Sequence, residues 1–272
     1  MMVKNLKPNI RVYHNLARSG GTLISKCIAS MQKVILFSEI HPYLETVDTI
    51  YLKSRLPQNI FLQAKNWHNL FTKKDIEILL SEQSRIDFVK ITKIIYDKVN
   101  KLKSTLVLRD WTHLDFTTYP FLSSMSLELR TAKILENDFN IIQATSVRHP
   151  IDQWLSMKNY PILENIDIEI FLKGYKHFSE ECKKIGFVRY EDFTIDPDKE
   201  LKNLCNMLQI KFDKNYKNKW FNYKKITGDT FNTEEKKIIP YKKKEIDKKI
   251  LLIFEKNNDY KKIIDNLGYE KY

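Results

Sequence analysis

The chain has 272 residues, a formal net charge of +12 at pH 7 and 43% hydrophobic residues. A chain of this length suits one large α/β domain or two small ones. It can bury a full hydrophobic core without needing disulfides or bound metals for stability. No window approaches the roughly 20 apolar residues of a membrane span, and the N-terminus lacks the apolar core of a signal peptide. We therefore expect a soluble, cytoplasmic protein without stable membrane insertion.

The positive charge comes mostly from lysines scattered along the chain. It could indicate nucleic acid or an anionic membrane, but the scatter favours a general field that attracts small polyanions, and we expect no nucleic-acid partner. Cys27, Cys182 and Cys205 are odd in number and widely spaced, which predicts core thiols in a reducing compartment. Neither a CxxC motif nor a Cys/His cluster offers a metal site.

The first informative stretch is a predicted strand, turn and helix over residues 9–31. Apolar residues alternate from Ile10 to Leu16 and then recur every three or four positions from Leu23 to Met31. Two of the six glycines, Gly20 and Gly21, lie side by side at this junction. Glycine pairs allow a sharp turn or a close approach of the backbone to a ligand.

The same junction predicts an anion site. Free N–H groups at the start of the helix, beside Arg18 and Ser19, attract negative charge. The alternative is a helix entry that Ser19 or Thr22 caps, but a cap needs neither the second glycine nor the arginine. The pattern is not GxxxxGK[ST], so it gives no direct support to ATP or GTP hydrolysis.

Further along the chain, predicted strands alternate with predicted helices. The other strands are expected at 34–38, 105–111, 140–147 and 187–190. Helices are expected over most of 43–103, over 127–139, from Pro150, over 168–184 before Gly186, from Pro197, from Lys243, and last before Gly268. This alternation predicts an α/β fold with a parallel sheet covered on both faces. Because the sequence shows neither internal repeats nor low-complexity linkers, we treat residues 1–272 as a single domain.

Ionisable residues follow three of the predicted strands. Glu39 and His113 stand just past their strands, as Arg18 does. Open parallel sheets bind ligands at the carboxyl ends of their strands, so the three together favour a site. Each alone has a structural alternative, a cap for Glu39 and a packed core position for His113. Arg109 and Asp110 are interpreted as an internal ion pair or register device.

Another basic residue, Arg148, precedes the helix that Pro150 opens, and Ser156 lies about two turns into that helix. The two can share one anion only if it lies alongside the helix. The charge run Lys242 to Lys244 is interpreted as a solvated face.

Three segments together resemble the sulfotransferases that use 3′-phosphoadenosine 5′-phosphosulfate (PAPS). ARSGGTL at 17–23 resembles their 5′-phosphosulfate loop, SVRHPIDQWLS at 146–156 their 3′-phosphate motif, and RYEDFTIDP with its helix at 189–208 their late strand and helix. SEIHP at 38–42 and RDWTHLDF at 109–116 are similar to bacterial members. The resemblance implies a P-loop NTPase-like three-layer sandwich whose central five-stranded parallel sheet has the order 2-3-1-4-5.

The resemblance also implies roles for individual residues. Arg18 matches the basic residue at the bridging oxygen of the phosphosulfate, and His113 or Glu39 the general base. The resemblance implies that PAPS is released as adenosine 3′,5′-bisphosphate (PAP) after transfer. The residues implied to bind it are Arg18, Ser19, Gly20, Gly21, Thr22, Leu23, Arg148, Ser156 and Tyr190. No metal is implied. The C-terminal segment with Lys224, Lys225 and Gly228 only approximates the Arg-Lys-Gly signature of the family.

The implied function is sulfuryl transfer to a hydroxyl, or an amine, of an unidentified small-molecule, carbohydrate or lipid acceptor. The helical insertion 43–103 would cover the acceptor side, with Trp67, Tyr119 and Phe121 as an apolar wall. A P-loop-like small-molecule or nucleotide kinase is the alternative, although the Walker lysine is missing and the pair of Arg148 and Ser156 argues against it. A non-catalytic basic binding protein would leave the residues at the strand ends unexplained.

Overall fold

A computed structural model describes residues 7–42, 56–82, 86–118, 122–229 and 236–272. Within them, five strands form one parallel sheet in the order β2-β3-β1-β4-β5. The strands are β1 (Asn9–Asn15), β2 (Val34–Ile40), β3 (Thr105–Asp110), β4 (Asn140–Val147) and β5 (Phe187–Arg189). The predicted α/β class, the five parallel strands and their order are confirmed.

The central strand is β1, which pairs with β3 on one side and with β4 along its whole length on the other. Ile10, Val12 and Tyr13 are fully buried because helices cover both faces of the sheet. The loop that follows β1 therefore emerges in the middle of the sheet edge.

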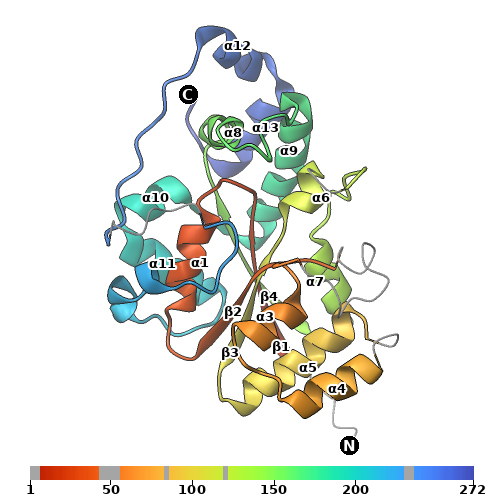
Figure 1. The fold of residues 1–272 in the computed structure, drawn as a ribbon. Helices are drawn as coiled ribbons and strands as arrows, with labels where there is room; N and C mark the ends of the chain where they lie inside the picture. The colour runs from red at the N-terminus through yellow and green to blue at the C-terminus, as the bar shows by residue number, and fades with distance from the viewer. Residues whose placement is uncertain (1–6, 43–55, 83–85, 119–121, 230–235) are drawn as a thin grey trace, which may run out of the picture.

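Helices cover the sheet on two sides (Figure 1). The Tyr13 face packs against α1 (Gly21–Ala29) and α11 (Pro197–Met207). The Ile10 face packs against α3 (Ile60–Asn66), α4 (Lys73–Ser81), α5 (Phe88–Lys101) and α7 (Arg130–Leu135). The result is a three-layer arrangement.

A third cluster lies beyond the carboxyl ends of the central strands, at the top of Figure 1. It joins α6 (His113–Thr117), α8 (Pro150–Lys158), α9 (Ile168–Ile185), α12 (Lys248–Lys256) and α13 (Asn258–Leu267). Gly174 of α9 lies so close to α6 that an added Cβ would stand 1.7 Å from the carbonyl oxygen of Phe116. This glycine therefore sets the contact between α9 and the short helix that begins at His113.

Several predicted boundaries shift in the structure. Strand β2 runs on to Ile40, with an irregularity in its pairing between Phe37 and Ile40. Tyr190 begins α10 (Tyr190–Ile195) instead of ending β5. Helix α7 covers only part of the predicted 127–139. The connection that follows α3 lies over the sheet, since the His68 ring lies 4.9 Å from that of Phe37 and its Nε2 contacts the Leu36 carbonyl.

The predicted helix from Lys243 was wrong at its start. Helix α12 begins at Lys248, where the Asp247 side chain caps it by accepting from Lys249 N. The preceding segment is held elsewhere, because Lys244 N donates to Asp152 of α8. The interpretation of Lys242 to Lys244 as a solvated face holds for Lys242 and Lys243, whereas Lys244 is half-buried.

The three cysteines are buried free thiols, as predicted. Burial raises the pKa of Cys27, Cys182 and Cys205, so they remain protonated core residues. Across the described residues, we find no helix with both the length and the apolar character that a membrane crossing requires.

Candidate active site

A cavity of about 450 Å³ lies at the carboxyl edge of the sheet, around the loop after β1. Sheets of this kind bind ligands at such a point, where successive connections leave in opposite directions. The predicted residues that line the cavity are Arg18, Gly20, Gly21, Thr22, Glu39, His113, Arg148, Ser156 and Tyr190. Of the predicted set, Ser19 and Leu23 do not line it, since Ser19 Oγ donates to Leu16 O and the Leu23 side chain packs in the core.

Close contacts leave no room for a side chain at either glycine of the loop. Gly20 has φ +86°, and an added Cβ would lie 2.0 Å from the Tyr190 ring. A Cβ on Gly21 would lie 2.1 Å from the Asn15 amide nitrogen. Gly20 occupies the N-cap of α1 and no side chain caps the helix, so the alternative of a Ser19 or Thr22 cap was wrong. The first N–H groups of α1 open at the cavity, where Gly20, Gly21 and Thr22 form its wall.

Arg18 joins the two predicted phosphate-binding regions. It adopts a left-handed conformation with φ 61°. Its Nε donates to Ser156 Oγ at 3.2 Å, and its carbonyl accepts from Arg148 Nη1 at 3.2 Å. Burial lowers the pKa of Arg18, and the nearby charge of Arg148 adds to that effect. Two arginine side chains in the wall of one cavity favour the binding of an anion there.

Two neighbouring aromatic rings contact Arg148. Its guanidinium carbon lies 5.1 Å from the centre of the Tyr190 ring and 4.8 Å from that of Tyr241. The side chain is only 8% exposed, yet its Nε makes no hydrogen bond to any described residue. A buried donor without a partner is costly, so this nitrogen fits a ligand with acceptor oxygens such as a phosphate.

At the other end of the cavity, Glu39 faces Arg109. Glu39 has φ 55° within the irregular end of β2, and its Oε1 lies 3.3 Å from Arg109 Nη2. Both side chains are largely buried, at 15% and 5% exposure. The interpretation of Arg109 and Asp110 as a mutual pair was wrong, because neighbouring residues of a strand point to opposite faces. Arg109 lines the cavity, and Asp110 pairs with His14.

His113 begins α6 and lies in the same wall of the cavity, with its ring 5.7 Å from that of Trp111. Burial lowers the pKa of His113 to about 4, opposed by the charge of Glu39 and reinforced by that of Arg109. The imidazole is therefore neutral at pH 7, which is the form that can accept a proton.

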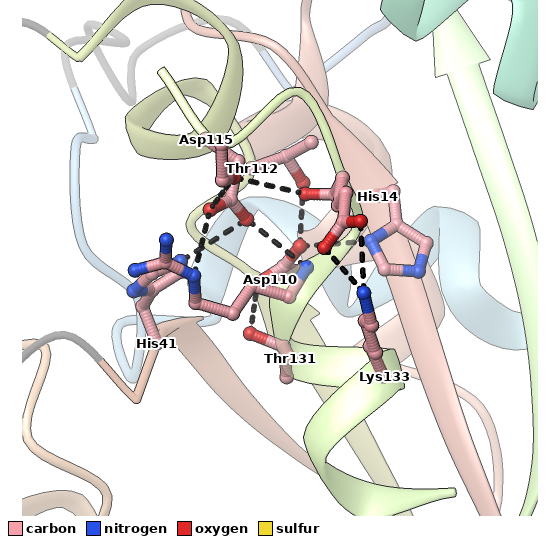
Figure 2. A network of polar contacts seen from close by, with 10 residues as sticks. His14, His41, Asp110, Thr112, Asp115, Thr131 and Lys133 are labelled. Carbon is pink, nitrogen blue, oxygen red and sulfur yellow. Dashed lines mark hydrogen bonds and ion pairs between the residues drawn. The ribbon is translucent and has the colours of Figure 1, made fainter. Parts of the chain in front are cut away.

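A buried polar network fixes the backbone on both sides of His113 (Figure 2). Asp110 accepts from His14 at 2.8 Å, Thr112 at 3.0 Å and Thr131 at 2.6 Å. Asp115 contacts His41 at 3.1 Å and accepts from Ser126 at 2.7 Å. Two carboxylates with their hydrogen bonds satisfied, one on each side of His113 in the chain, fix the short segment that carries His113.

The loop after the 3-10 helices Lys214–Asn218 and Trp220–Asn222 closes the cavity from the side of α1. Gly228 lines it, and its carbonyl accepts from Thr22 Oγ1 at 3.3 Å. The fully buried Lys26 pairs with Asp229 at 2.7 Å. Lys224 and Lys225 are exposed, and neither lines the cavity.

Sequence analysis missed part of the cavity wall. Tyr160, Ile162 and Leu163 come from the connection between α8 and α9, and Gln58 precedes α3. Nothing in their spacing marks them, since they follow an irregular loop. The expected apolar wall differs as well, because Trp67 does not line the cavity and Tyr119 and Phe121 lie outside the described residues. The described part of the chain holds no cluster of His, Cys, Asp or Glu suited to a metal ion.

Comparison with known proteins identifies the fold. The sulfotransferase domain of the Synechococcus PCC 7002 olefin synthase superposes with a TM-score of 0.69 at 16% identity, covering 98% of this chain and 97% of that one. The sulfotransferase domain from the curacin biosynthetic pathway gives 0.62 at 17% identity, covering 98% and 100%. No family model and no curated protein matches the sequence. The chain thus has the fold of these sulfotransferase domains over nearly its whole length.

Proposed function

We propose that this protein is a sulfotransferase that uses PAPS as donor and a hydroxyl-bearing molecule as acceptor. The observation that carries the proposal is the juxtaposition of two anion sites in one cavity. One is the uncapped start of α1 with Arg18, and the other is Arg148 with its unpartnered Nε. A donor with a 5′-phosphosulfate and a 3′-phosphate would occupy both, and no Walker lysine stands in the loop to favour a kinase.

PAPS supplies the sulfuryl group, which moves from the 5′-phosphate oxygen to the acceptor oxygen. Arg18 and the N–H groups at the start of α1 stabilise the charge that remains on the 5′-phosphate. Gly20 lets the loop approach closely, and Tyr190 holds the loop from the other side. Arg148 and Ser156 bind the 3′-phosphate. Each role is the one that the resemblance implies for that residue, and each of these residues lines the cavity.

His113 is the general base in this proposal. Its neutral imidazole takes the proton of the acceptor hydroxyl as the new O–S bond forms. Glu39 is already paired with Arg109, so it suits the task of orienting the acceptor better than that of removing its proton. Trp111, Ile162 and Leu163 line the same cavity and give its wall an apolar part, which suits an acceptor with an apolar part next to the hydroxyl.

The test is calorimetric titration with PAP, with 5′-AMP as the control nucleotide. We expect wild type to bind PAP much more tightly than 5′-AMP, and Arg148→Ala to lose that preference. One charge-assisted hydrogen bond to phosphate is worth roughly 10-fold or more in affinity. Equal and weak binding of both nucleotides by wild type would refute the proposal. PAP-selective binding would justify a screen of hydroxyl acceptors with labelled PAPS.

A further inference from the structure

The turn that follows α8 brings an aromatic ring to Arg18. The guanidinium carbon of Arg18 lies 5.2 Å from the centre of the Tyr160 ring, a distance at which an aromatic face attracts a cation. Both residues line the cavity. None of the motifs that predict the site includes Tyr160, so this contact exists only in the folded chain.

The Arg18 side chain is held at two points by α8 and the turn after it. Arg18 Nε donates to Ser156 Oγ at 3.2 Å, and Tyr160 follows four residues later, just past the end of α8. Residues four apart lie on the same side of a helical turn, so the hydroxyl and the ring reach the same guanidinium. An arginine side chain has several rotatable bonds, and two contacts restrict them. The guanidinium is therefore held in one place before a ligand binds.

The turn that carries Tyr160 is fixed by its own backbone. Tyr160 N donates to Met157 O at 2.9 Å, and Leu163 N donates to Tyr160 O at 2.8 Å. Pro161 follows Tyr160, and a proline restricts both its own φ and the conformation of the residue before it. Leu163 is buried in the hydrophobic cluster of α8 and α9. The Tyr160 ring thus belongs to a well-packed turn.

We infer that Tyr160 is a positioning residue for Arg18. In the proposed function, Arg18 stabilises the negative charge that stays on the 5′-phosphate oxygen when the bond from that oxygen to sulfur breaks. A donor is most effective when it already lies where the charge develops, because it then needs no reorganisation during the reaction. The Tyr160 ring and Ser156 Oγ provide that fixed position. The inference rests on the proposed function, since it assigns Tyr160 to the departing phosphate of the proposed donor.

The experiment compares Tyr160→Leu, which removes the ring, with Tyr160→Phe, which removes only the hydroxyl. The readout is release of labelled sulfate from PAPS to water, which breaks the same bond between sulfur and the 5′-phosphate oxygen and needs no identified acceptor. Because a contact between a cation and an aromatic face is worth a few-fold in rate, we expect Tyr160→Leu to lower hydrolysis about 5-fold. PAP affinity should fall less than that, and Tyr160→Phe should hydrolyse PAPS as wild type does.

A second background shows whether Tyr160 acts through Arg18. If it does, Tyr160→Leu has no further effect on hydrolysis once Arg18→Gln has removed the guanidinium, so the two substitutions are not additive. The same fold-loss in both backgrounds would overturn the inference, because Tyr160 would then act independently of Arg18.

NMR of arginine-labelled protein tests the contact without any donor. An aromatic ring shifts the signals of protons held near its face, and the Arg18 Nε–H signal is assigned by its absence in Arg18→Gln. We expect this signal to move in Tyr160→Leu and to stay near its wild-type position in Tyr160→Phe. An unmoved signal in Tyr160→Leu would overturn the inference.

Phe221→Leu is the matched control. It also removes a ring that a cation approaches, since Lys236 Nζ lies 5.8 Å from the centre of the Phe221 ring, but Phe221 does not line the cavity. We expect this variant to hydrolyse PAPS and to bind PAP as wild type does. Thermal unfolding establishes that each variant is folded.

The outcomes separate this inference from the proposed function. If Tyr160→Leu hydrolyses PAPS as fast as wild type and the preference for PAP over 5′-AMP is intact, the inference is overturned and the proposed function stands. If Tyr160→Phe loses as much as Tyr160→Leu, the hydroxyl and not the ring is needed, which also overturns the inference. If wild type neither hydrolyses PAPS nor distinguishes PAP from 5′-AMP, both are overturned.

Discussion

The two ends of the cavity are built in different ways. At the end with Gly20, Gly21 and Arg148, shape comes from the backbone, and two positions tolerate no side chain. At the end with His113 and Glu39, shape comes from side chains fixed by buried partners, Arg109 for the glutamate and the Asp110 network for the histidine. In the proposed function, the first end binds the phosphates of the donor and the second end holds the acceptor.

This difference predicts separable effects on binding and on turnover. A backbone cradle binds its ligand in every state of the reaction, whereas a base acts only as the proton leaves. Variants at the first end should therefore change nucleotide affinity, with or without a change in turnover, whereas variants at the second should change turnover at full occupancy and leave nucleotide affinity unchanged.

The largest expected effect is that of His113→Asn on turnover. Loss of a general base costs about 10²- to 10⁴-fold in rate, while PAP affinity should stay within a factor of about two or three of wild type. Glu39→Gln, at the same end, should lose less. Turnover with labelled PAPS and calorimetry with PAP provide the two measurements. If Glu39→Gln loses more turnover than His113→Asn, the roles of the two residues are reversed.

Next in size is the effect of Gly21→Ala on stability and binding together. The added Cβ would stand 2.1 Å from Asn15, a buried residue that also accepts from Arg109 Nε at 3.2 Å. Overpacking of this kind costs about 1–3 kcal/mol and displaces the loop that forms the anion site. Urea unfolding and PAP titration measure both effects.

Gly186→Ala is the control for this substitution. Gly186 ends α9 with φ +96°, and a Cβ there would meet the flexible Met207 side chain at 3.2 Å. We expect it to lower stability by about 1 kcal/mol without changing PAP affinity. If Gly21→Ala binds PAP as wild type does, the loop does not form the anion site.

Another substitution tests the pair of Glu39 and Arg109. Arg109→Met leaves the Glu39 carboxylate without its cation, which should cost about 3 kcal/mol of unfolding free energy. Glu39→Gln in the same chain should recover part of that cost, because the uncompensated charge is gone. A double-mutant cycle measures the coupling between the two side chains. Independent, additive effects would contradict a direct pairing.

The loop after β1 and the position of Arg148 and Ser156 could be predicted because their signals are local. A strand pattern, two adjacent glycines and a helix pattern follow one another over residues 9–31, and the turn between them needs no distant partner. Arg148 and Ser156 belong to one helix and its entry, so their separation follows from helix geometry. The parallel sheet places these pieces at one edge.

The missed parts depend on contacts between distant residues. Asp152 contacts Lys244, which is 92 residues away in the sequence, and Tyr272, which is 120 residues away. No periodicity in the sequence predicts such contacts. Arg109 was misassigned for a different reason, since adjacency to Asp110 was taken for contact although alternation along a strand separates the two. In both cases the partner of a charged residue lies far from it in the sequence, and the residue next to it in the chain is not its partner.

The smallest prediction concerns pH and the residue after Arg148. Ile151 N donates to His149 Nδ1, and burial lowers the pKa of His149 to about 4. The folded chain therefore keeps this ring neutral where the unfolded chain, with a pKa near 6.5, begins to bind a proton. The stability due to a neutral His149 is complete above pH 6.5 and is lost as the pH falls toward 4.

His149→Phe isolates that contribution, because it keeps an aromatic ring beside Tyr272 but cannot take up a proton. Each such histidine contributes at most about 1.4 kcal/mol per pH unit to the slope of unfolding free energy against pH. We expect the slope between pH 6.5 and 4 to be shallower in His149→Phe, even if loss of the Ile151 hydrogen bond lowers stability at every pH. Urea unfolding at several pH values measures the slope. Parallel curves for the two proteins would mean that the folded chain protonates His149 over the same pH range as the unfolded chain, which would add positive charge next to Arg148 in acid.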